Sequence, residues 1–211
     1  MILLLLIAIT SIFSYQALNN ISLFDRYKFS VHSIIKNKEY DRLISSAFLH
    51  ADLTHLFFNM YTLFIFGPIV INQFGIIIFL LIYFLSVLGG NFLTLFLEKN
   101  NFYYTAIGAS GGVVGIVFSA IVLEPNIQLY LFFILPLKGW LFGILYLFFS
   151  IYGMRTQLGN IGHSAHFGGA VIGILIPIIL DQSFFYQNQL YISILFIPIL
   201  YLAIQMRRDK N

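Results

Sequence analysis

The stretch GASGGVVGIVFSAIVL, residues 108–123, is short, apolar and rich in glycine, and Glu124 and Pro125 follow it. The part from Ser110 onward falls short of the roughly 20 apolar residues that a helix needs to cross a bilayer. Its glycines let other helices approach closely, because no side chain holds the backbones apart. The sequence therefore predicts a short helix in the centre of a bundle, where neighbouring helices shield it from lipid.

Six other apolar runs flank this segment, and they cover residues 1–18, 53–71, 76–97, 127–152, 163–180 and 190–206. The first is interpreted as a retained helix, because it has neither a basic start nor a clear signal-peptide cleavage site. The run at 127–152 is interrupted at Pro136 and Lys138, so its helical core is predicted at 140–152. The residues before Pro136 are interpreted as a connection that lies along the bundle.

The composition is that of a chain that lies mostly within a lipid bilayer. Of the 211 residues, 60% are apolar and 9% are charged, whereas an ordinary soluble domain has roughly 25% charged residues. This argues against a soluble enzyme, a disordered chain and a coiled coil. The absence of Cys excludes disulfides, thiolate metal sites and a cysteine nucleophile. The net charge of +3 is small and its cations are clustered, so a nucleic acid partner is not expected. We predict an all-α, multi-pass membrane protein.

Residues 19–47 form the longest polar stretch and are predicted to be an interfacial loop with short amphipathic pieces. The loop carries five Lys and Arg, and Arg207, Arg208 and Lys210 follow the last apolar run. If the chain crosses the membrane seven times, both clusters lie on the same side. The positive-inside rule would place that side in the cytoplasm.

Polar side chains at bilayer depth are costly and therefore indicate function, and they gather at three places. At the first, the start of the second span, His55 and Asn59 are four residues apart and share one helix face. Both can donate hydrogen bonds. His50 lies just before the helix, which Asp52 or Thr54 could cap. The alternative is a pair of interhelical hydrogen bonds that hold the bundle together.

The second place is Gly108-Ala109-Ser110-Gly111-Gly112. A Ser between small residues at a helix N-terminus exposes its hydroxyl, and the unpaired backbone N–H groups there favour an anion. Such an arrangement suits a nucleophile beside an oxyanion site. The alternative is packing, because Ser is a common N-cap and Gly108/Gly112 fits a small-residue packing motif.

The third place is the start of the sixth span, where His166 precedes Gly169 and Gly173 by three and seven residues. All three lie on one helix face, and the glycines would let a second helix approach closely. The other Gly-rich span is the expected partner. Close packing of the two would bring the imidazole of His166 within reach of the Ser110 hydroxyl.

Together the three places predict a chemistry that none predicts alone. Ser110 would attack a carbonyl, and His166 would take its proton and return it to the leaving amine. The side chains of His55 and Asn59 and the backbone N–H of Ser110 would stabilise the oxyanion. No carboxylate lies near His166 in the sequence, so a dyad is predicted rather than a triad.

These residues resemble the rhomboid family of intramembrane serine proteases. The resemblance rests on His50-x4-His55-x3-Asn59, Gly108-Ala109-Ser110-Gly111 and Ala165-His166-x2-Gly169-x3-Gly173, which occur in family order. It covers roughly residues 40–180. Arg42 also resembles a family position in the first loop, although Asp41 stands where an aromatic residue is often found.

The resemblance implies a six-helix core, residues 1–185, with the serine at the top of a short central helix in a water-filled cavity. It implies cleavage of the transmembrane segments of other proteins, without a metal or a cofactor. The fifth span and the loop before Ser110 would form the gate and the cap. The residue roles that it implies are nucleophile for Ser110, general base for His166, oxyanion donors for His55 and Asn59, and structural support for His50, Gly108, Gly111, Gly169 and Gly173. Residues 186–211 are then a C-terminal addition with a seventh transmembrane helix.

The resemblance also implies a location, the inner membrane of a bacterium, with the first loop and the active site on the outer side. The basic clusters predict the reverse orientation. We predict the orientation that the resemblance implies. If the run at 190–206 did not span the membrane, the C-terminal cluster would change sides and most of this conflict would vanish.

Three alternatives lead to different functions. A rhomboid-like fold could bind transmembrane segments without cleaving them, although both Ser110 and His166 are present. Four histidines, at positions 50, 55, 163 and 166, could bind or transport a metal, but the sequence lacks a His-Glu-x-x-His motif and an acidic intramembrane ligand. A transporter or channel would need polar groups along a pathway, whereas here they lie at one end of three helices.

Overall fold

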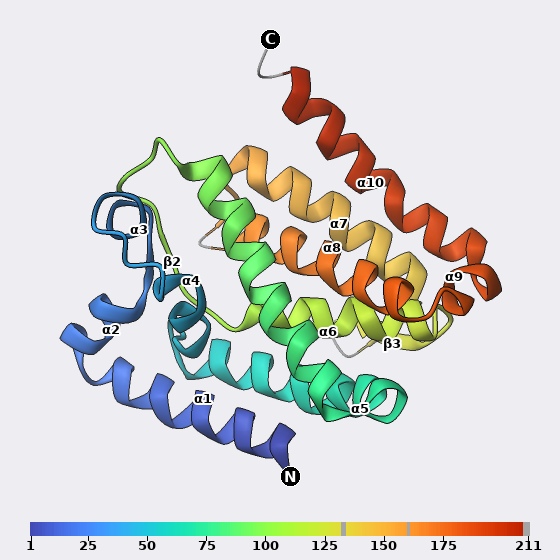
Figure 1. Ribbon diagram of the computed structural model, residues 1–211, viewed down its shortest axis with the longest axis horizontal. Coiled ribbons are helices and arrows are strands. Elements are labelled where there is room, and N and C mark those ends of the chain that lie inside the picture. The colour runs from blue at the N-terminus through green and yellow to red at the C-terminus, as the bar shows by residue number, and fades with distance from the viewer. Residues whose placement is uncertain (132–133, 160, 209–211) are drawn as a thin grey trace.

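The computed structural model describes residues 1–131, 134–159 and 161–208. Six longer helices build the bundle, namely α1 (Ile2–Leu18), α5 (Leu53–Glu98), α6 (Ser110–Leu123), α7 (Gly139–Thr156), α8 (His163–Leu180) and α10 (Gln189–Arg208). Among the described residues, α5, α8 and α10 are long and apolar enough to cross a membrane, and α1 and α6 are shorter apolar helices. The prediction of an all-α, multi-pass membrane protein is confirmed. Figure 1 shows the bundle with the N-terminus at the free end of α1 and the C-terminus beyond α10.

Helix α5 contains the second and third predicted spans. Gly75 within it has non-helical angles (φ 79°, ψ 170°), so the chain turns there and runs back. A positive φ of this size is open to glycine at no steric cost. The two halves, 53–74 and 76–98, are each long enough to cross the hydrocarbon core. Figure 1 shows them as the cyan and the green arms of one bent helix.

Helix α6 is the centre of the bundle, as its short glycine-rich sequence predicts. It packs against both α5 and α8, and nearly every residue after Ser110 is buried. Its backbone touches that of α8, because a Cβ on Gly169 would overlap Gly111 O and a Cβ on Gly173 would overlap Gly115 O. Only glycine at these positions permits such a close approach.

The first loop folds into short elements that lie over one end of the bundle. These are α2 (Ile21–Tyr27), β1 (Phe29–Ser30), α3 (Val31–Lys36), α4 (Arg42–Ser45) and η1 (Ser46–Phe48). Strand β1 pairs antiparallel with β2 (Thr105–Ala106), in the segment before α6. Arg42 is buried and donates to the carbonyls of Asp25 and Lys28, both at 2.8 Å. Through these bonds the Arg42 side chain holds separate parts of the loop together.

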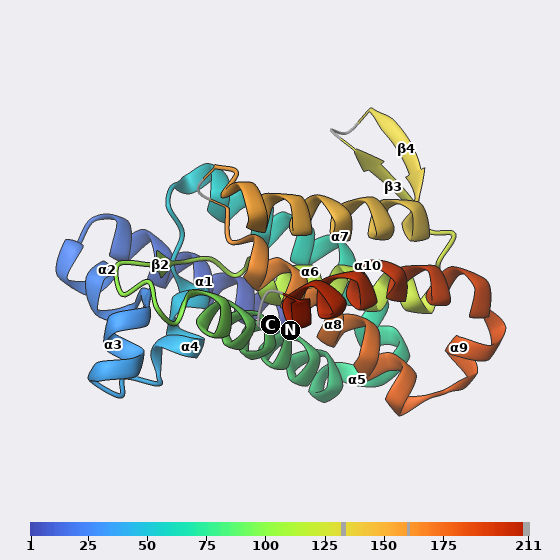
Figure 2. The same cartoon turned by 90° about the horizontal axis from the view of Figure 1, so that it is seen from above.

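The segment before α7 differs from the sequence interpretation. Instead of lying along the bundle, strands β3 (Gln128–Leu131) and β4 (Leu135–Lys138) form an antiparallel hairpin. Figure 2 shows this hairpin projecting away from the helices. The physical reason is that Pro136 opposes helix formation here, and strand pairing gives the backbone groups of the segment the partners that an extended chain against apolar helices would lack.

The C-terminal part consists of α9 (Ser183–Gln187) and α10, and α10 lies along α7 (Figure 1). Trp140 and Tyr191 stack with ring centroids 5.7 Å apart, and Leu195 is buried beside Gly143. The last turn of α10 lines the same cavity as the loops around the start of α6. The predicted helix at 190–206 is therefore present and runs back to that end, while Lys210 lies outside the described residues.

Candidate functional site

Ser110 and His166 meet at the end of the bundle where α6 and α8 both begin. The distance from Ser110 Oγ to His166 Nε2 is 2.6 Å. The close glycine contacts between α6 and α8, one turn further along at Gly169, hold the two helices near enough for this bond. A serine hydroxyl hydrogen-bonded to an imidazole is the arrangement in which the imidazole can accept the hydroxyl proton.

Tyr146 of α7 forms a hydrogen bond with the other ring nitrogen of His166. Its hydroxyl lies 3.0 Å from His166 Nδ1, and the two rings stack with centroids 6.2 Å apart. Tyr146 thus fixes both the position and the plane of the imidazole. The sequence analysis missed this residue, because a Tyr within an aromatic-rich span carries no signal when 13 tyrosines are present.

His55 and Asn59 lie on the first turns of α5, beside the serine. Asp52 caps this helix by accepting from the His55 N–H at 2.7 Å, so of the two predicted caps Asp52 is the one used. The Ala51 N–H donates to His55 Nδ1 at 3.5 Å, which leaves the imidazole proton on Nε2. Asn59 Nδ2 donates to His55 O at 3.0 Å and keeps a second N–H for another acceptor.

Gly108 lies between the serine and His55. A Cβ at this position would be 3.2 Å from His55 Nε2 and 3.5 Å from Ser110 Oγ, and the φ of Gly108 is +124°. Both the space and the backbone conformation therefore require glycine. Ser110 is the first residue of α6, so its backbone N–H has no partner within the helix.

His50 is buried beneath this site and belongs to its scaffold. The Ala109 N–H donates to His50 Nε2 at 3.4 Å, so Nδ1 carries the proton and donates to Ser14 Oγ at 3.1 Å. Burial, and to a smaller extent the neighbouring His55, lower the pKa of His50 to about 3. The neutral ring links α1 to the turn before Ser110.

A cavity of about 680 Å³ contains the four side chains Ser110, His166, His55 and Asn59. Its walls come from the first half of α5, from α7 and from the loop at Ile161 and Gly162, and α6 forms its floor. Below the serine the lining becomes apolar, with the side chains Val113, Val114, Val117, Phe118 and Phe142. The cavity thus joins a polar site to an apolar groove between two helices.

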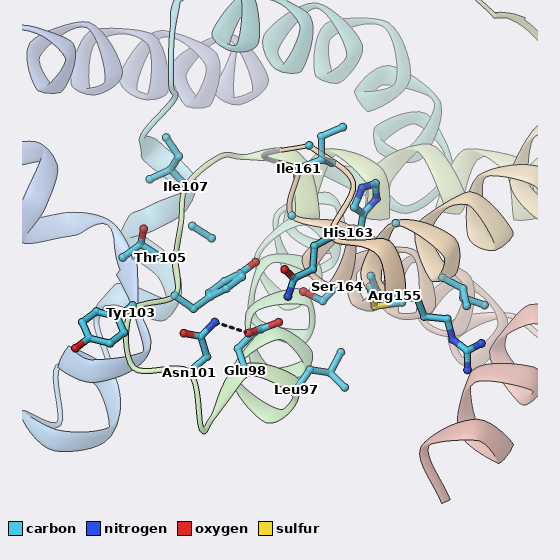
Figure 3. A pocket seen from close by; sticks show the side chains of 18 of the residues that line it. Leu97, Glu98, Asn101, Tyr103, Thr105, Ile107, Arg155, Ile161, His163 and Ser164 are labelled. Carbon is cyan, nitrogen blue, oxygen red and sulfur yellow. Dashed lines mark hydrogen bonds between the residues drawn. The ribbon is translucent and has the colours of Figure 1, made fainter. Parts of the chain in front are cut away.

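A second cavity of about 860 Å³ adjoins the first and shares His55, Ile107 and Ile161 with it. Figure 3 shows its wall, where Glu98 accepts a hydrogen bond from Asn101 and where His163 and Ser164 lie beside the loop at Ile161. Charged and polar groups from the first loop, from the end of α7 and the residue after it, and from α10 also line it, namely Lys28, Arg155, Gln157 and Gln205. A cavity with many polar groups therefore adjoins the one that contains Ser110.

No group of three or more His, Asp or Glu side chains within the described residues could hold a metal ion. The histidines of the metal hypothesis have other hydrogen-bond partners. His50 and His166 have both ring nitrogens in hydrogen bonds, and His163 Nε2 lies 3.1 Å from Leu158 O.

Comparison with known proteins identifies the class to which this arrangement belongs. The family model of the Rhomboid domain matches residues 37–183. This covers more than half of the chain and contains all four cavity side chains. The chain belongs to the rhomboid family, and the resemblance seen in the sequence is confirmed.

Three individual relatives show how far the similarity extends. RHOMBOID-like protein 12, mitochondrial, of Arabidopsis thaliana is 32% identical over 63% of this chain and 44% of its own length. The putative rhomboid protease YdcA of Bacillus subtilis is 39% identical over 39% of this chain and 40% of its length. Inactive RHOMBOID-like protein 8 of A. thaliana is 30% identical over 45% of this chain and 27% of its length.

The chain spans less than half the length of these relatives. Their names describe a mitochondrial protein, a putative protease and an inactive protein. The family match and the apolar helices agree with an integral, multi-pass membrane protein. The bacterial inner membrane predicted from the sequence has no support from the mitochondrial relative.

Proposed function

We propose that this protein is an intramembrane serine endopeptidase that cleaves transmembrane segments of other membrane proteins. The observation that carries the proposal is the 2.6 Å contact between Ser110 Oγ and His166 Nε2 inside a cavity walled by apolar helices. A half-buried serine at a helix N-terminus, paired with an imidazole that is itself oriented by a third side chain, fits nucleophilic acyl transfer better than packing.

The first step moves one proton between the two side chains of the dyad. His166 Nε2 accepts the Ser110 hydroxyl proton as Oγ bonds to the carbonyl carbon of the scissile peptide. The resulting imidazolium then donates that proton to the leaving amine, and an acyl ester remains on Ser110. His166 Nδ1–H donates to the Tyr146 hydroxyl throughout, which keeps Nε2 aimed at the serine.

The negative charge that develops on the carbonyl oxygen needs donors that are already in place. His55 Nε2–H, the free Asn59 Nδ2–H and the Ser110 backbone N–H line one side of the cavity, around Gly108. In a site with little water, such fixed donors stabilise the oxyanion more strongly than they would in bulk solvent. Water from the adjoining polar cavity then hydrolyses the acyl ester, with His166 as the base.

The apolar groove below the serine favours a transmembrane segment as substrate. A helix that enters between α5 and α7 would find lipid-like side chains along its length and polar groups only at the level of Ser110. Its peptide bond must leave the helical conformation at that level, because a carbonyl within a helix is shielded by its own backbone. This is the physical reason why helix-breaking and small residues near the cleavage site are expected.

Two substitutions test the proposal on the purified protein with a tagged model transmembrane substrate. Ser110→Ala and His166→Ala are each expected to reduce cleavage by at least about 100-fold, because nucleophile and base are lost. A fluorophosphonate probe should label Ser110 in the unchanged protein and not in either variant. Ser183→Ala and His32→Ala, which change the same residue types far from the cavity, are the matched controls. Undiminished cleavage by Ser110→Ala would falsify the proposal.

The second candidate is a rhomboid-like protein that binds transmembrane segments without cutting them, and the inactive relative of A. thaliana favours it. This candidate predicts that the model substrate co-purifies with the unchanged protein, with no cleavage and no probe labelling. The same assay thus distinguishes the two.

The proposal also includes the membrane in which the protein resides. A bacterial plasma membrane is retained as a prediction, with the Bacillus subtilis relative in its favour and the mitochondrial relative against it. Fractionation of the source cells, followed by detection of the chain in the separated membranes, decides between them.

A further inference from the structure

Asn91 is a buried polar residue on the second half of α5, outside the three polar places that the sequence analysis singled out. It is 8% exposed and lies within the apolar run at 76–97. A polar side chain in such a run is costly and needs partners. Both partners are in the first loop, because Asn91 Nδ2 donates to Leu43 O at 2.7 Å and to Ser46 Oγ at 3.2 Å. Asn91 therefore attaches α4 and η1 to α5.

Ser46 connects this contact to the turn before Ser110. Ser46 is also buried, and its backbone carbonyl accepts a hydrogen bond from the Gly108 N–H at 3.0 Å. Its side chain thus contacts Asn91, while its carbonyl contacts Gly108. The three residues form a continuous series of hydrogen bonds that runs from α5 to the start of α6.

The turn itself contains three successive N–H groups with different partners. The Gly108 N–H donates to Ser46 O, and the Ala109 N–H donates to His50 Nε2 at 3.4 Å. The Ser110 N–H comes next and has no partner within its helix. Because peptide groups are planar, holding the first two restricts the direction of the third. Gly108, with a φ of +124°, would otherwise leave this turn free to rearrange.

We infer that Asn91 is a positioning residue for the oxyanion site. Through Ser46 it holds the peptide group of Gly108, so that the Ser110 N–H stays directed at the carbonyl oxygen on which charge develops. Such a donor is effective only if it is already in place when the charge appears. The inference rests on the proposed function, because it assigns Asn91 a role in that reaction.

The first loop has a second attachment that does not involve Asn91. Strand β1 pairs with β2 through Phe29 and Ala106, and the Val31 N–H donates to Tyr104 O at 3.2 Å. Loss of the Asn91 amide is therefore expected to loosen Ser46 and Gly108 while the rest of the loop stays folded.

Asn91→Leu tests the inference, because leucine has a similar volume and no donor. We expect kcat for the model transmembrane substrate to fall about 10-fold and KM to stay within about twofold, since a misplaced oxyanion donor weakens the transition state and not substrate binding. Fluorophosphonate labelling of Ser110 should slow by a similar factor, because attack on phosphorus also needs the oxyanion donors. Asn72→Leu, at an exposed position of the same helix, is the matched control. An unchanged kcat and labelling rate for Asn91→Leu overturns the inference.

Ser46→Ala tests the route with a milder change. It removes the Oγ acceptor and keeps both the backbone carbonyl and the bond from Asn91 to Leu43 O, so labelling should slow about threefold. The double variant of Ser46→Ala and Asn91→Leu should label at the rate of Asn91→Leu alone, because two changes in one series of contacts are not additive. A double variant slowed by the product of the two separate factors contradicts a route through Ser46.

A third variant separates positioning from a general loss of stability. Leu195 packs beside Gly143 instead of lining the cavity that contains Ser110. Leu195→Ala should lower the melting temperature at least as much as Asn91→Leu, yet label at nearly the original rate well below that temperature. If the labelling rates of both variants simply follow their melting temperatures, Asn91 has a structural role only and the inference fails.

Hydrogen exchange of the backbone amides in the segment that contains Gly108 measures the positioning without any catalysis. Exchange should become faster in Asn91→Leu and in Ser46→Ala, and should stay the same in Asn72→Leu. Equal exchange in all three variants contradicts the inference. If the unchanged protein neither cleaves nor labels, the proposed function fails while the exchange result still shows whether Asn91 holds Gly108, so the two failures are distinguishable.

Discussion

At the scale of single residues, the hydroxyl of Tyr146 is expected to orient His166 without taking part in the reaction itself. Tyr146→Phe keeps the ring that stacks on His166 and loses the hydroxyl at 3.0 Å from Nδ1. Without that acceptor the imidazole samples other rotations and the other tautomer. We expect kcat to fall about 10-fold, with KM nearly unchanged, since general-base catalysis depends on the correct proton position.

The comparison for this prediction is Tyr152→Phe, on the same helix but at an exposed position. It should keep full activity. If Tyr146→Phe cleaves at the unchanged rate, while its melting temperature also stays the same, Tyr146 does not orient His166. Rates of Ser110 labelling by a fluorophosphonate give an independent measure, because they need no transmembrane substrate.

His50 makes the stability of the protein depend on pH in a defined window. Its pKa is about 3 in the folded protein, because the ring is buried, and close to 6.5 in an unfolded chain. Between these values the unfolded state binds the proton and the folded state does not. The contribution of the neutral ring is therefore complete above about pH 6.5 and is lost as the pH falls, at most by ~1.4 kcal/mol per pH unit.

Melting temperatures of the detergent-solubilised protein between pH 7.5 and pH 4.5 test this dependence. The melting temperature should fall toward acid pH, and His50→Gln should flatten the slope even though it lowers the value at neutral pH. His32→Gln, which replaces an exposed histidine, should keep the original slope. An identical slope for His50→Gln would show that other groups cause the acid sensitivity.

At the scale of elements, the contact between α6 and α8 sets the position of the dyad. A Cβ at Gly173 would overlap the carbonyl oxygen of Gly115, and a backbone oxygen cannot turn away as a side chain can. We expect Gly173→Ala to cost ~1–3 kcal/mol of stability through overpacking. It should also reduce cleavage, because α8 must shift and carry His166 away from Ser110. Gly162→Ala, whose Cβ would meet Ala165 at an ordinary 3.7 Å, is the control. Equal melting temperatures for the two variants would contradict this account.

The contact between α10 and α7 makes the C-terminal helix part of the folded unit. Leu195 is 1% exposed and packs beside Gly143, whereas Leu200 on the same helix is 60% exposed. Leu195→Ala should destabilise by ~2–5 kcal/mol, because it leaves a cavity in a packed interface, and Leu200→Ala should have little effect. Thermal unfolding followed by circular dichroism gives both values. Similar losses for the two variants would mean that α10 contacts lipid on all sides.

The sequence predicted these elements unevenly, and the reasons are physical. Apolar length and glycine clustering were enough for the spans, for the central position of α6 and for the proximity of its glycines to those of α8. The hairpin before α7 was missed, because a short apolar run before a proline has the same composition as a buried connection. Tyr146 was missed because its partner, His166, lies 20 residues away on another helix, and no local spacing reports such a contact.

At the scale of the whole molecule, the cavity that contains Ser110 implies a route for the substrate. It lies between the first half of α5 and α7, and it becomes apolar with distance from the dyad. A transmembrane segment is too apolar to leave the bilayer, so it must enter sideways between these two helices. Small probes need no such opening, because they can arrive through the adjoining polar cavity, which is about 860 Å³ in volume.

A covalent bridge across the route distinguishes the two paths. Thr62 on α5 and Phe142 on α7 both line the cavity, and the absence of natural cysteine makes a double variant, Thr62→Cys with Phe142→Cys, free of side reactions. After treatment with a bis-maleimide of matching length, cleavage of the transmembrane substrate should fall at least 10-fold. Labelling of Ser110 by a small fluorophosphonate should continue at nearly its original rate, because the bridge leaves the polar cavity open. The double variant treated with a monofunctional maleimide controls for bulk in the groove. If the bridged protein still cleaves the transmembrane substrate at full rate, the substrate does not pass between α5 and α7, and the polar cavity would have to admit an unwound segment.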